Sequence, residues 1–269
     1  MPLAVCATPI GNLDDVTLRV LAELRDADVV LCEDTRVTRA LLDRHALRAR
    51  VLSYHEHNEA KRTAELLPRL GAGERVALVS DAGLPGISDP GARLIAAALD
   101  AGVPVTVLPG PSAVETALVA SGLEAERYQF VGFLPRGAGA LKELWAELAR
   151  WPHAVVAFES AQRLPRTLAS LADVLPERRA AVCRELTKFY EEIVRGTAAE
   201  LAARFAEAPK GEIVLVLGPA SADSGDDVVN EASAAVAELV AAGLPRRRAA
   251  ELVSRLTGVS RNTLYGASL

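Results

Sequence analysis

Aromatic residues and long apolar runs are both scarce in this chain of 269 residues. Phe, Trp and Tyr make up 4% of it, so aliphatic side chains must fill the core. No uninterrupted apolar run reaches the roughly 18 residues of a membrane-spanning helix, which excludes such a helix. The N-terminus enters a strand pattern without a basic segment before it, and we therefore expect no signal peptide.

Cysteine is also sparse, and the three present (Cys6, Cys32 and Cys183) lie far apart in apolar segments. Their spacing suits neither a disulfide framework nor a zinc site, so we expect a cytoplasmic protein. The chain carries 30 Lys and Arg against 35 Asp and Glu, a formal charge of −5. This balance excludes a uniformly basic nucleic-acid-binding protein and leaves a local basic surface open.

Short apolar segments rich in β-branched residues alternate with amphipathic helical patterns through the first half. Nearly continuous apolar strands are typical of a parallel sheet covered by helices on both faces. The second half alternates less regularly, and two close segments joined by 186–190 predict an antiparallel hairpin in a mixed sheet. We therefore predict an α/β fold with an open parallel sheet first and a mixed sheet second. The expected strands are 3–7, 29–32, 51–54, 76–79 and 103–108 in the first sheet, and 130–134, 154–158, 180–184, 191–195 and 213–217 in the second; the clearest helices of the first half are 17–25, 59–70 and 92–101.

Loops rich in small residues follow the first, fourth and fifth expected strands. Right-handed crossovers bring these loops to the carboxyl edge of the sheet, where open sheets bind ligands. The loop Ser80–Gly91 holds three glycines and two prolines, so its backbone can approach a ligand closely. Asp81 is expected to accept a hydrogen bond from a ligand, and Asp89 before Pro90 is expected to cap the next helix. No loop matches the GxGxxG or Walker pattern, so neither a dinucleotide nor a triphosphate is indicated.

Three polar clusters follow other strands. In the first cluster, Glu33–Arg36, Arg36 could bind a phosphate and Asp34 or Glu33 a ribose. The alternative is an acidic helix start that is capped by Asp34 or Thr35. His55–Asn58 contains an HxH pair, but no further His or Cys completes a metal site, so we expect no metal and either a substrate-facing histidine or a plain loop. The segment Arg184–Glu192 contains Lys188, one of only four lysines in the chain, among acidic residues. Its pKa is either tuned for function, or the segment is a solvated cluster of ion pairs.

Six motifs of this chain resemble, in order and spacing, those of the ribosomal RNA small-subunit methyltransferase I family. That family belongs to the tetrapyrrole methylase superfamily of S-adenosylmethionine-dependent methyltransferases. The porphyrin-precursor methylases of the superfamily carry a GxGxGD-type loop where this chain has TPIGNLDD, which speaks against a tetrapyrrole substrate. The motifs are ATPIGNLDDVTLR, CEDTRVTRALL, SYHEHNE, SDAGLPGISDPG, LPGPSA and RELTKFYEE.

The resemblance implies a two-lobed fold with S-adenosylmethionine in the cleft between an N-terminal α/β domain (1–112) and a C-terminal α/β domain (113–219). It also implies a homodimer that methylates the ribose 2′-hydroxyl of a cytidine in the decoding region of 16S ribosomal RNA. Carried over by position, the cofactor-binding residues would be Pro9, Gly11, Asp81, Ala82, Gly83, Ile87, Ser112 and Ala113, and by looser alignment Phe158, Cys183 and Gly211.

A ribose hydroxyl is a poor nucleophile, so a nearby base or a cation would help methyl transfer. Our catalytic candidates are Lys188 with Glu185, and Asp34 or His55 as substitutes. Glu33, Arg36 and Asn58 are candidates for substrate binding. A tetrapyrrole or protein side-chain acceptor, or a non-catalytic regulator that binds a small molecule, are the alternative functions.

The end of the chain is predicted to be a helical tail (228–269) after a linker, 218–227. A helix, a glycine turn and a capped helix are typical of a helix-turn-helix, with helices expected at 229–242, 246–256 and 261–267. Residues 244–269 hold five arginines and one acid in an otherwise acidic chain. We expect this tail to contact RNA, and the alternative is an appendage that stabilises the fold or a dimer. The candidate RNA-binding arginines are Arg246, Arg247, Arg248 and Arg261.

Overall fold

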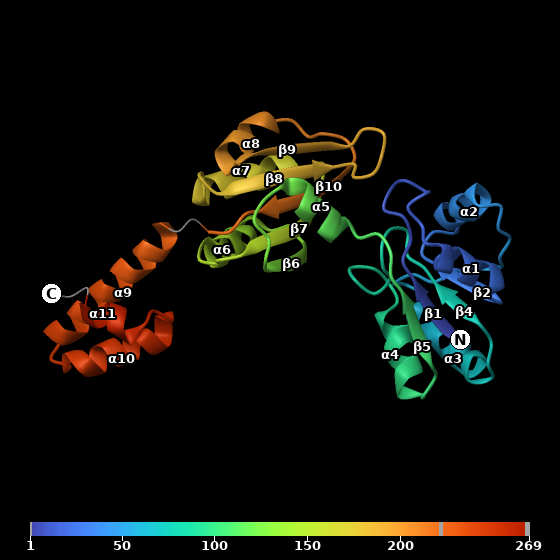
Figure 1. Ribbon diagram of the computed structural model, residues 1–269, viewed down its shortest axis with the longest axis horizontal. Coiled ribbons are helices and arrows are strands. Elements are labelled where there is room, and N and C mark those ends of the chain that lie inside the picture. Colours follow the sequence, from blue (N-terminus) through green and yellow to red (C-terminus); the bar gives the residue numbers. More distant parts are fainter. Residues whose placement is uncertain (1, 221–222, 267–269) are drawn as a thin grey trace.

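A computed structural model describes residues 2–220 and 223–266, with the backbone alone for 223–228 and Gly266. Its elements form three parts that follow one another along the molecule (Figure 1). We call the part around the first sheet the first lobe, the part around the second sheet the second lobe, and the three last helices the tail. No helix among the described residues is both long and apolar enough to cross a membrane.

The first lobe is built on a sheet of five parallel strands in the order β3-β2-β4-β1-β5. One apolar cluster, with Leu3 and Val76, packs on one face, and another, with Ala4 and Val30, packs on the other. The predicted parallel sheet with two covered faces is therefore confirmed. Its elements are β1 (Leu3–Cys6), α1 (Leu18–Asp26), β2 (Val29–Cys32), α2 (Thr35–Arg44), β3 (Val51–Ser53), α3 (Glu59–Gly71), β4 (Val76–Leu78), α4 (Ala92–Asp100) and β5 (Val105–Leu108).

The second lobe holds the predicted mixed sheet, in the order β6-β7-β10-β8-β9. Only β6 and β7 run parallel, and β8 and β9 form the expected antiparallel hairpin, with Arg184 opposite Glu192. Helix α5 covers one face, where Val114 and Leu118 pack, and Trp145 of α6 is buried on the other. The elements are α5 (Ala113–Ser121), β6 (Tyr128–Phe133), α6 (Ala138–Ala149), β7 (Ala154–Ser160), α7 (Leu164–Val174), β8 (Arg179–Arg184), β9 (Glu192–Thr197), α8 (Ala198–Arg204) and β10 (Glu212–Leu217).

The tail consists of α9 (Asp223–Ala241), α10 (Arg246–Thr257) and α11 (Arg261–Gly266), which enclose a small apolar core of their own. Gly258 ends α10 in the left-handed conformation, at φ 75°, and the Ser260 hydroxyl accepts the Thr263 N–H in the first turn of α11. The predicted helix, glycine turn and capped helix are therefore confirmed. Helix α9 starts inside the segment predicted as a linker; residues 221–222 of that linker, and the end of the last helix at Ala267, lie outside the described residues.

One predicted cap is wrong. Asp89 does not cap the helix after the glycine-rich loop, because α4 begins at Ala92, where its predicted range begins, and its N-cap is Gly91, at φ 139°. Since a φ of this size favours glycine, Gly91 lets the chain turn directly into the helix. Asp89 is left partly buried among other carboxyl groups of the first lobe. Burial, with Glu33 and Asp81 nearby, raises its pKa to about 6.

Candidate active site

The loops after β1 and β4 are joined by backbone hydrogen bonds. Thr8 N–H donates to the Gly83 carbonyl at 2.8 Å, and Gly83 N–H donates to the Thr8 carbonyl at 3.0 Å. The Thr8 hydroxyl also donates to the Ser80 carbonyl at 3.0 Å. On the other side of β1, a Cβ added at Gly110 would lie 2.9 Å from the Ala7 Cβ. The three small-residue loops therefore meet at one edge of the sheet, with the β1 loop between the other two.

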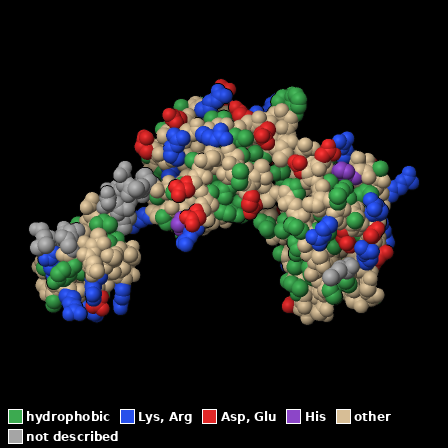
Figure 2. Space-filling model, in the orientation of Figure 1, with side chains coloured by type: hydrophobic (Ala, Val, Ile, Leu, Met, Phe, Trp, Pro, Cys, Tyr) green, Lys and Arg blue, Asp and Glu red, His purple; other side chains and the backbone are tan. Residues whose placement is uncertain are grey.

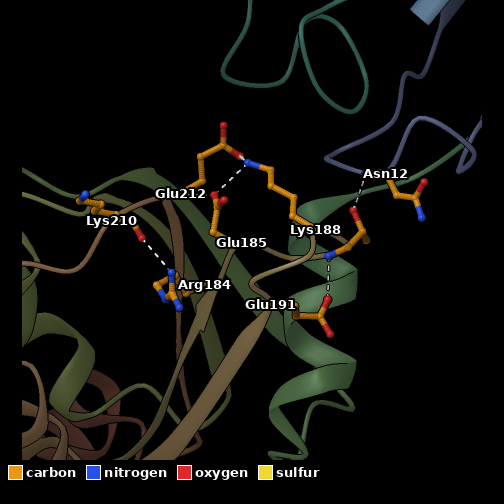
Figure 3. Close-up of polar contacts among 8 residues, drawn as sticks. Asn12, Arg184, Glu185, Lys188, Glu191, Lys210 and Glu212 are labelled. Atoms are coloured by element: carbon orange, nitrogen blue, oxygen red, sulfur yellow. Dashed lines mark hydrogen bonds and ion pairs between the residues drawn. The ribbon is translucent and has the colours of Figure 1, made fainter. Parts of the chain in front are cut away.

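The β1 loop also enters the second lobe. Ile10 is buried in the apolar cluster beneath α5. A Cβ added at Gly11 would lie 2.6 Å from the Lys188 Cγ and 2.8 Å from the Leu186 carbonyl oxygen, closer than real Cβ contacts. Asn12 N–H donates to the Thr187 hydroxyl at 3.0 Å (Figure 3). We call this contact between 10–12 and 186–188 the lobe junction, and it requires a glycine at position 11.

A groove of about 430 Å³ lies beside the lobe junction, between the two lobes. Its walls come from the β1 loop, the start of α1, the β5 loop, α5 and the β8–β9 loop. Because it is formed by both lobes, its shape depends on how they are held together. It is lined by Ile10, Asp14, Asp15, Val16, Thr17, Gly110, Pro111, Thr116 and Thr187.

Most of the predicted cofactor-binding residues lie on the three joined loops. Pro9 and Gly83 are buried, Asp81, Ser112 and Ala113 are partly exposed, and Ala82 and Ile87 are exposed. The looser candidates differ from one another. Phe158 is partly exposed and packs against the Phe130 and Phe133 rings, while Gly211, at φ 102°, faces Glu185.

Cys183 is more deeply buried than the other two looser candidates. Its side chain is fully buried between the second sheet and α5, and its thiol points to the Ala117 carbonyl at 3.7 Å. Burial raises its pKa to about 12. Cys183 is thus part of the core of the second lobe, as an apolar strand position would be. Like the other predicted cofactor-binding residues, it is not among those that line the groove.

Lys188 lies between two carboxylates. Its Nζ is 2.9 Å from Glu185 Oε1 and 2.9 Å from Glu212 Oε2, and both acids point toward it in Figure 3. Glu185 Oε1 also accepts the Glu212 N–H at 3.0 Å, which ties the β8–β9 loop to the start of β10. The sequence singled out Lys188 and Glu185 but missed Glu212, because an acid at a strand start has no local signal that pairs it with a lysine 24 residues away.

The charges of this cluster follow from its contacts. Burial by itself lowers the pKa of the Lys188 ammonium, but the hydrogen bonds to Glu212 and Glu185 outweigh it, so the pKa lies above its usual value. The backbone N–H of Glu212, with Lys188, lowers the pKa of the Glu185 carboxyl. Lys188 is therefore a cation at neutral pH, and Glu185 is a weaker base than a free glutamate.

A second cavity, of about 440 Å³, lies at the carboxyl ends of β2, β3 and β4. Asp81 Oδ1 accepts the Asp34 N–H at 3.0 Å and so links the β2 and β4 loops. Burial, with Asp81 nearby, raises the pKa of Glu33, and burial also raises that of Asp81. The cavity is lined by Glu33, Asp34, Thr35, Ser53, His55, His57 and Asp81.

Asp34 has a structural role in this cavity. It is the N-cap of α2, accepts the Arg36 N–H at 2.8 Å, and forms an ion pair with the Arg36 side chain at 2.5 Å. The hydrogen bonds from the Arg36 side chain and backbone lower its pKa to about 2. Asp34 therefore caps the start of α2, which is the alternative interpretation of this cluster, and its role as a catalytic base stays a prediction. Arg36 is exposed and held by the same pair.

His55 is held by Asn58. The Asn58 Oδ1 accepts the His55 N–H at 2.9 Å, and its amide Nδ2 donates to the Ser53 carbonyl at 3.2 Å. The same Nδ2 lies 3.1 Å from the His55 Nε2, which is therefore an acceptor. Asn58 thus orients the histidine, and its own polar groups face the loop rather than a substrate. Strand β3 lies three strands from β1, about 14 Å, so the structure does not bring His55 to the lobe junction.

No group of three or more His, Cys, Asp and Glu side chains within 2–220 and 223–266 is arranged to hold a metal ion.

The tail arginines fall into two kinds. Arg246 packs over the Tyr265 ring and donates to the Tyr265 carbonyl at 3.0 Å, and Arg248 pairs with Glu251 at 3.2 Å. Arg247 and Arg261 are exposed, and neither forms an ion pair with a described residue. Lys and Arg side chains gather along the edge of the tail that points away from the second lobe in Figure 2.

Two α/β lobes with such loops between them define the class of protein. The family model "Tetrapyrrole (Corrin/Porphyrin) Methylases" matches residues 2–202, and "RsmI C-terminal HTH domain" matches 226–269. A solved structure of uroporphyrin-III C-methyltransferase from Thermus thermophilus, complexed with S-adenyl homocysteine, is similar in fold, with a TM-score of 0.56 and 22% identity. The alignment covers 80% of this chain and 96% of the uroporphyrin-III C-methyltransferase chain. The fold is therefore that of the tetrapyrrole methylases.

Curated relatives narrow the class. "Ribosomal RNA small subunit methyltransferase I" of Mesorhizobium japonicum is 45% identical over 266 residues, which cover 98% of this chain and 90% of the relative. The protein of the same name from Neisseria meningitidis serogroup B is 40% identical, over 99% of this chain and 92% of the relative. The chain belongs to the ribosomal RNA small subunit methyltransferase I family.

Proposed function

We propose that this protein transfers the methyl group of S-adenosylmethionine to the ribose 2′-oxygen of a cytidine in the decoding region of 16S ribosomal RNA. The observation that carries the proposal is the 45% identity, over nearly the whole chain, to a ribosomal RNA small subunit methyltransferase I. We further propose that it acts in the cytoplasm as a homodimer with three domains (1–112, 113–219 and 228–269), on free RNA or on the small ribosomal subunit.

The joined loops fit the cofactor. Ser112 is the N-cap of α5, but its hydroxyl makes no bond to the helix amides and donates to Glu115 instead. The Ser112 hydroxyl therefore does not cap α5, and the Glu115 carboxylate lies in the first turn of the helix. When bound, S-adenosylmethionine supplies an already activated methyl group. We assign its binding to Pro9, Gly11, Asp81, Ala82, Gly83, Ile87, Ser112 and Ala113, with Phe158 and Gly211 on the second lobe.

Lys188 is our candidate for the charge that develops on the ribose oxygen. Its Nζ is held by two carboxylates at 2.9 Å, so its position is fixed before the substrate arrives. Methyl transfer breaks the sulfur–methyl bond of the cofactor, forms the oxygen–methyl bond and releases the hydroxyl proton to solvent water. A fixed cation stabilises the negative charge on the oxygen more than a mobile one, because no reorganisation is needed in the transition state. Glu185 is a positioning residue for this ammonium. Glu33 and His55, which line the second cavity, are the groups that we assign to the substrate nucleotide.

The test is transfer of labelled methyl from S-adenosylmethionine to small ribosomal subunits that lack their native modifications, followed by digestion to nucleosides. Label in 2′-O-methylcytidine is the expected result. Cofactor binding without any labelled nucleoside would overturn the RNA acceptor, and label in a tetrapyrrole or a protein side chain would identify an alternative acceptor. Absence of cofactor binding would overturn the methyltransferase itself.

A further inference from the structure

Two aromatic side chains project from the tip of the β8–β9 loop. Phe189 is 93% exposed and Tyr190 is 69% exposed, and their rings meet edge to face with centroids 5.0 Å apart. Figure 2 shows this tip as a protruding apolar cluster. The whole chain has only 5 Phe, 4 Tyr and 2 Trp. Two neighbouring aromatic residues left in water are therefore unusual here, since aromatic burial normally stabilises a core.

The loop that carries them is held in one conformation. Glu191 Oε2 accepts the Thr187 N–H at 2.6 Å, and Glu191 N–H donates to the Lys188 carbonyl at 3.1 Å. Glu185 and Thr187 have φ values of 51° and 64°, in the left-handed region that non-glycine residues seldom adopt. Such a backbone persists only where its surroundings fix it. The two rings are thus displayed on a rigid support.

This support borders the proposed reaction site. Thr187 lines the groove between the lobes, and Lys188 belongs to the lobe junction. Phe189 and Tyr190 follow these two residues directly in sequence, at the exposed tip of the same loop.

The chemistry of the tip favours a flat, unpaired ring as its partner. A stable interface between proteins buries about 800 Å² on each side, far more than two side chains offer, whereas one or two stacked bases match their size. Aromatic side chains are the usual platforms for unpaired bases in RNA recognition.

We propose that Phe189 and Tyr190 form a stacking platform for an unpaired RNA base next to the methylated nucleotide. This inference rests on the proposed RNA substrate and gives a role to two residues of the motif RELTKFYEE that were not candidates for substrate binding. It gives the β8–β9 loop two tasks: Lys188, paired with Glu185 and Glu212, stabilises the charge on the reacting oxygen, and the rings at the tip hold the neighbouring base.

The test compares Phe189→Ala/Tyr190→Ala with Phe189→Tyr/Tyr190→Phe, which keeps both rings, and with Val119→Ala, which shortens a side chain that is 82% exposed on α5. We expect the double alanine variant to raise the KM for RNA by roughly ten-fold or more, with kcat and cofactor affinity within about three-fold. The ring-keeping variant and Val119→Ala should behave as the wild type.

An unchanged KM in the double alanine variant overturns the platform while leaving methyl transfer to RNA in place. A shift of that variant from dimer to monomer in sedimentation velocity also overturns it, because the tip would then contact a second copy of the chain. If the wild type methylates no RNA, the proposed function fails, and the affinity for a single-stranded RNA oligonucleotide still decides the platform: weaker binding by the alanine variant supports it, and equal binding overturns it.

Discussion

At the lobe junction, Ile10 of the first lobe lies inside the apolar core of the second, and Gly11 leaves no space for a side chain. The tail meets the other end of the second lobe through an ion pair between Arg150 and Glu231, whose side chains are 68% and 69% exposed. The first contact is buried and interlocked, and the second is open to water. The tail also has its own core, with Val236 packed among neighbours from all three of its helices.

This difference separates two kinds of task. Catalysis needs reacting groups held to within a fraction of an ångström, which a buried junction provides. Binding a large RNA needs charge in roughly the right place, because phosphate contacts are long-ranged and tolerant of geometry. We therefore expect changes at the lobe junction to reduce the rate of methyl transfer, and changes in the tail to alter RNA affinity and its dependence on salt.

The largest effect is expected from Lys188→Ala. Loss of a fixed charge that stabilises a developing oxyanion typically slows a reaction by roughly 100- to 1,000-fold, and cofactor affinity should stay within about two-fold. Lys188→Met keeps the aliphatic stem that packs on Gly11, so equal losses in both variants assign the effect to the charge. Lys210→Ala, a change at an exposed lysine, is the matched control. Full activity of Lys188→Ala in single-turnover assays would remove Lys188 from the mechanism.

The pKa of Lys188 adds a pH test to this prediction. Because the two glutamates hold the ammonium pKa above its usual value, the cation persists through the whole neutral range. The rate of the wild type should therefore not fall between about pH 7 and pH 9 through loss of this proton. Over that range the wild type and Lys188→Met should show the same pH dependence. A fall confined to the wild type would indicate that Lys188 loses its proton in that range.

The next largest effect is expected from Gly11→Ala, which tests the junction as a spacer. The new Cβ would lie 2.6 Å from the Lys188 Cγ, so the lobes or the β8–β9 loop must shift, at a cost of about 1–3 kcal/mol in stability. We expect a lower melting temperature by calorimetry, weaker cofactor binding by titration and slower methyl transfer. Gly137→Ala is the control, because a Cβ there would meet nothing within 4 Å. Identical behaviour of the two variants would mean that the junction is looser than its contacts indicate.

The tail could be predicted from the sequence, and the lobe junction could not. Apolar strands and glycine-rich loops are local patterns, so the sheets, the three loops and the helix-turn-helix were predicted from segments of ten or so residues. The lobe junction is not local: Asn12 meets Thr187, and Lys188 meets Glu212. Such pairs depend on how the lobes pack, which no pattern within either segment encodes.

Local ambiguity explains why three residues with a structural role, or without the predicted one, could not be recognised from the sequence. Asp34 is the first acid before a helix, and a cap and a catalytic carboxylate look alike at that position until the Arg36 pair is seen. Cys183 sits in a strand whose alternate residues face either α5 or the opposite side, and both faces are buried. Asp89-Pro90 has the form of a helix start, but the φ of Gly91 ends the loop later. Each case concerns one residue whose type fits two roles.

A smaller effect, confined to binding, is expected from Arg247→Ala/Arg261→Ala in the tail. If each side chain contacts one phosphate, the slope of log affinity against log salt should fall in magnitude by roughly 1.5. At moderate salt the affinity for RNA should then drop several-fold, with cofactor affinity unchanged. Arg166→Ala, a change at an exposed arginine of α7 outside the tail, is the control. Unchanged slopes would favour the tail as an appendage that stabilises the fold or a dimer.

Removal of the whole tail extends this test. The cut belongs at Asp223 rather than within the tail, because a shorter deletion would expose Ala232 and Val236 of α9, which the other helices cover. The shortened protein should keep its cofactor affinity and lose salt-dependent RNA binding. Loss of cofactor binding would show that the tail supports the lobes after all.

The smallest effect is expected from Arg150→Ala, which breaks the ion pair between the second lobe and the tail. Both side chains are mostly exposed, and such surface pairs contribute about 0–1 kcal/mol, because water and salt compete with the partner. The melting temperature should therefore move by no more than about 2 °C, and RNA affinity should stay within about two-fold. Glu231→Ala should match it, because either change removes the same pair. A large loss of RNA affinity in both variants would mean that the tail must be fixed to the second lobe to bind RNA. The Arg150–Glu231 pair would then hold functional groups in place as the lobe junction does, although the two contacts differ in packing.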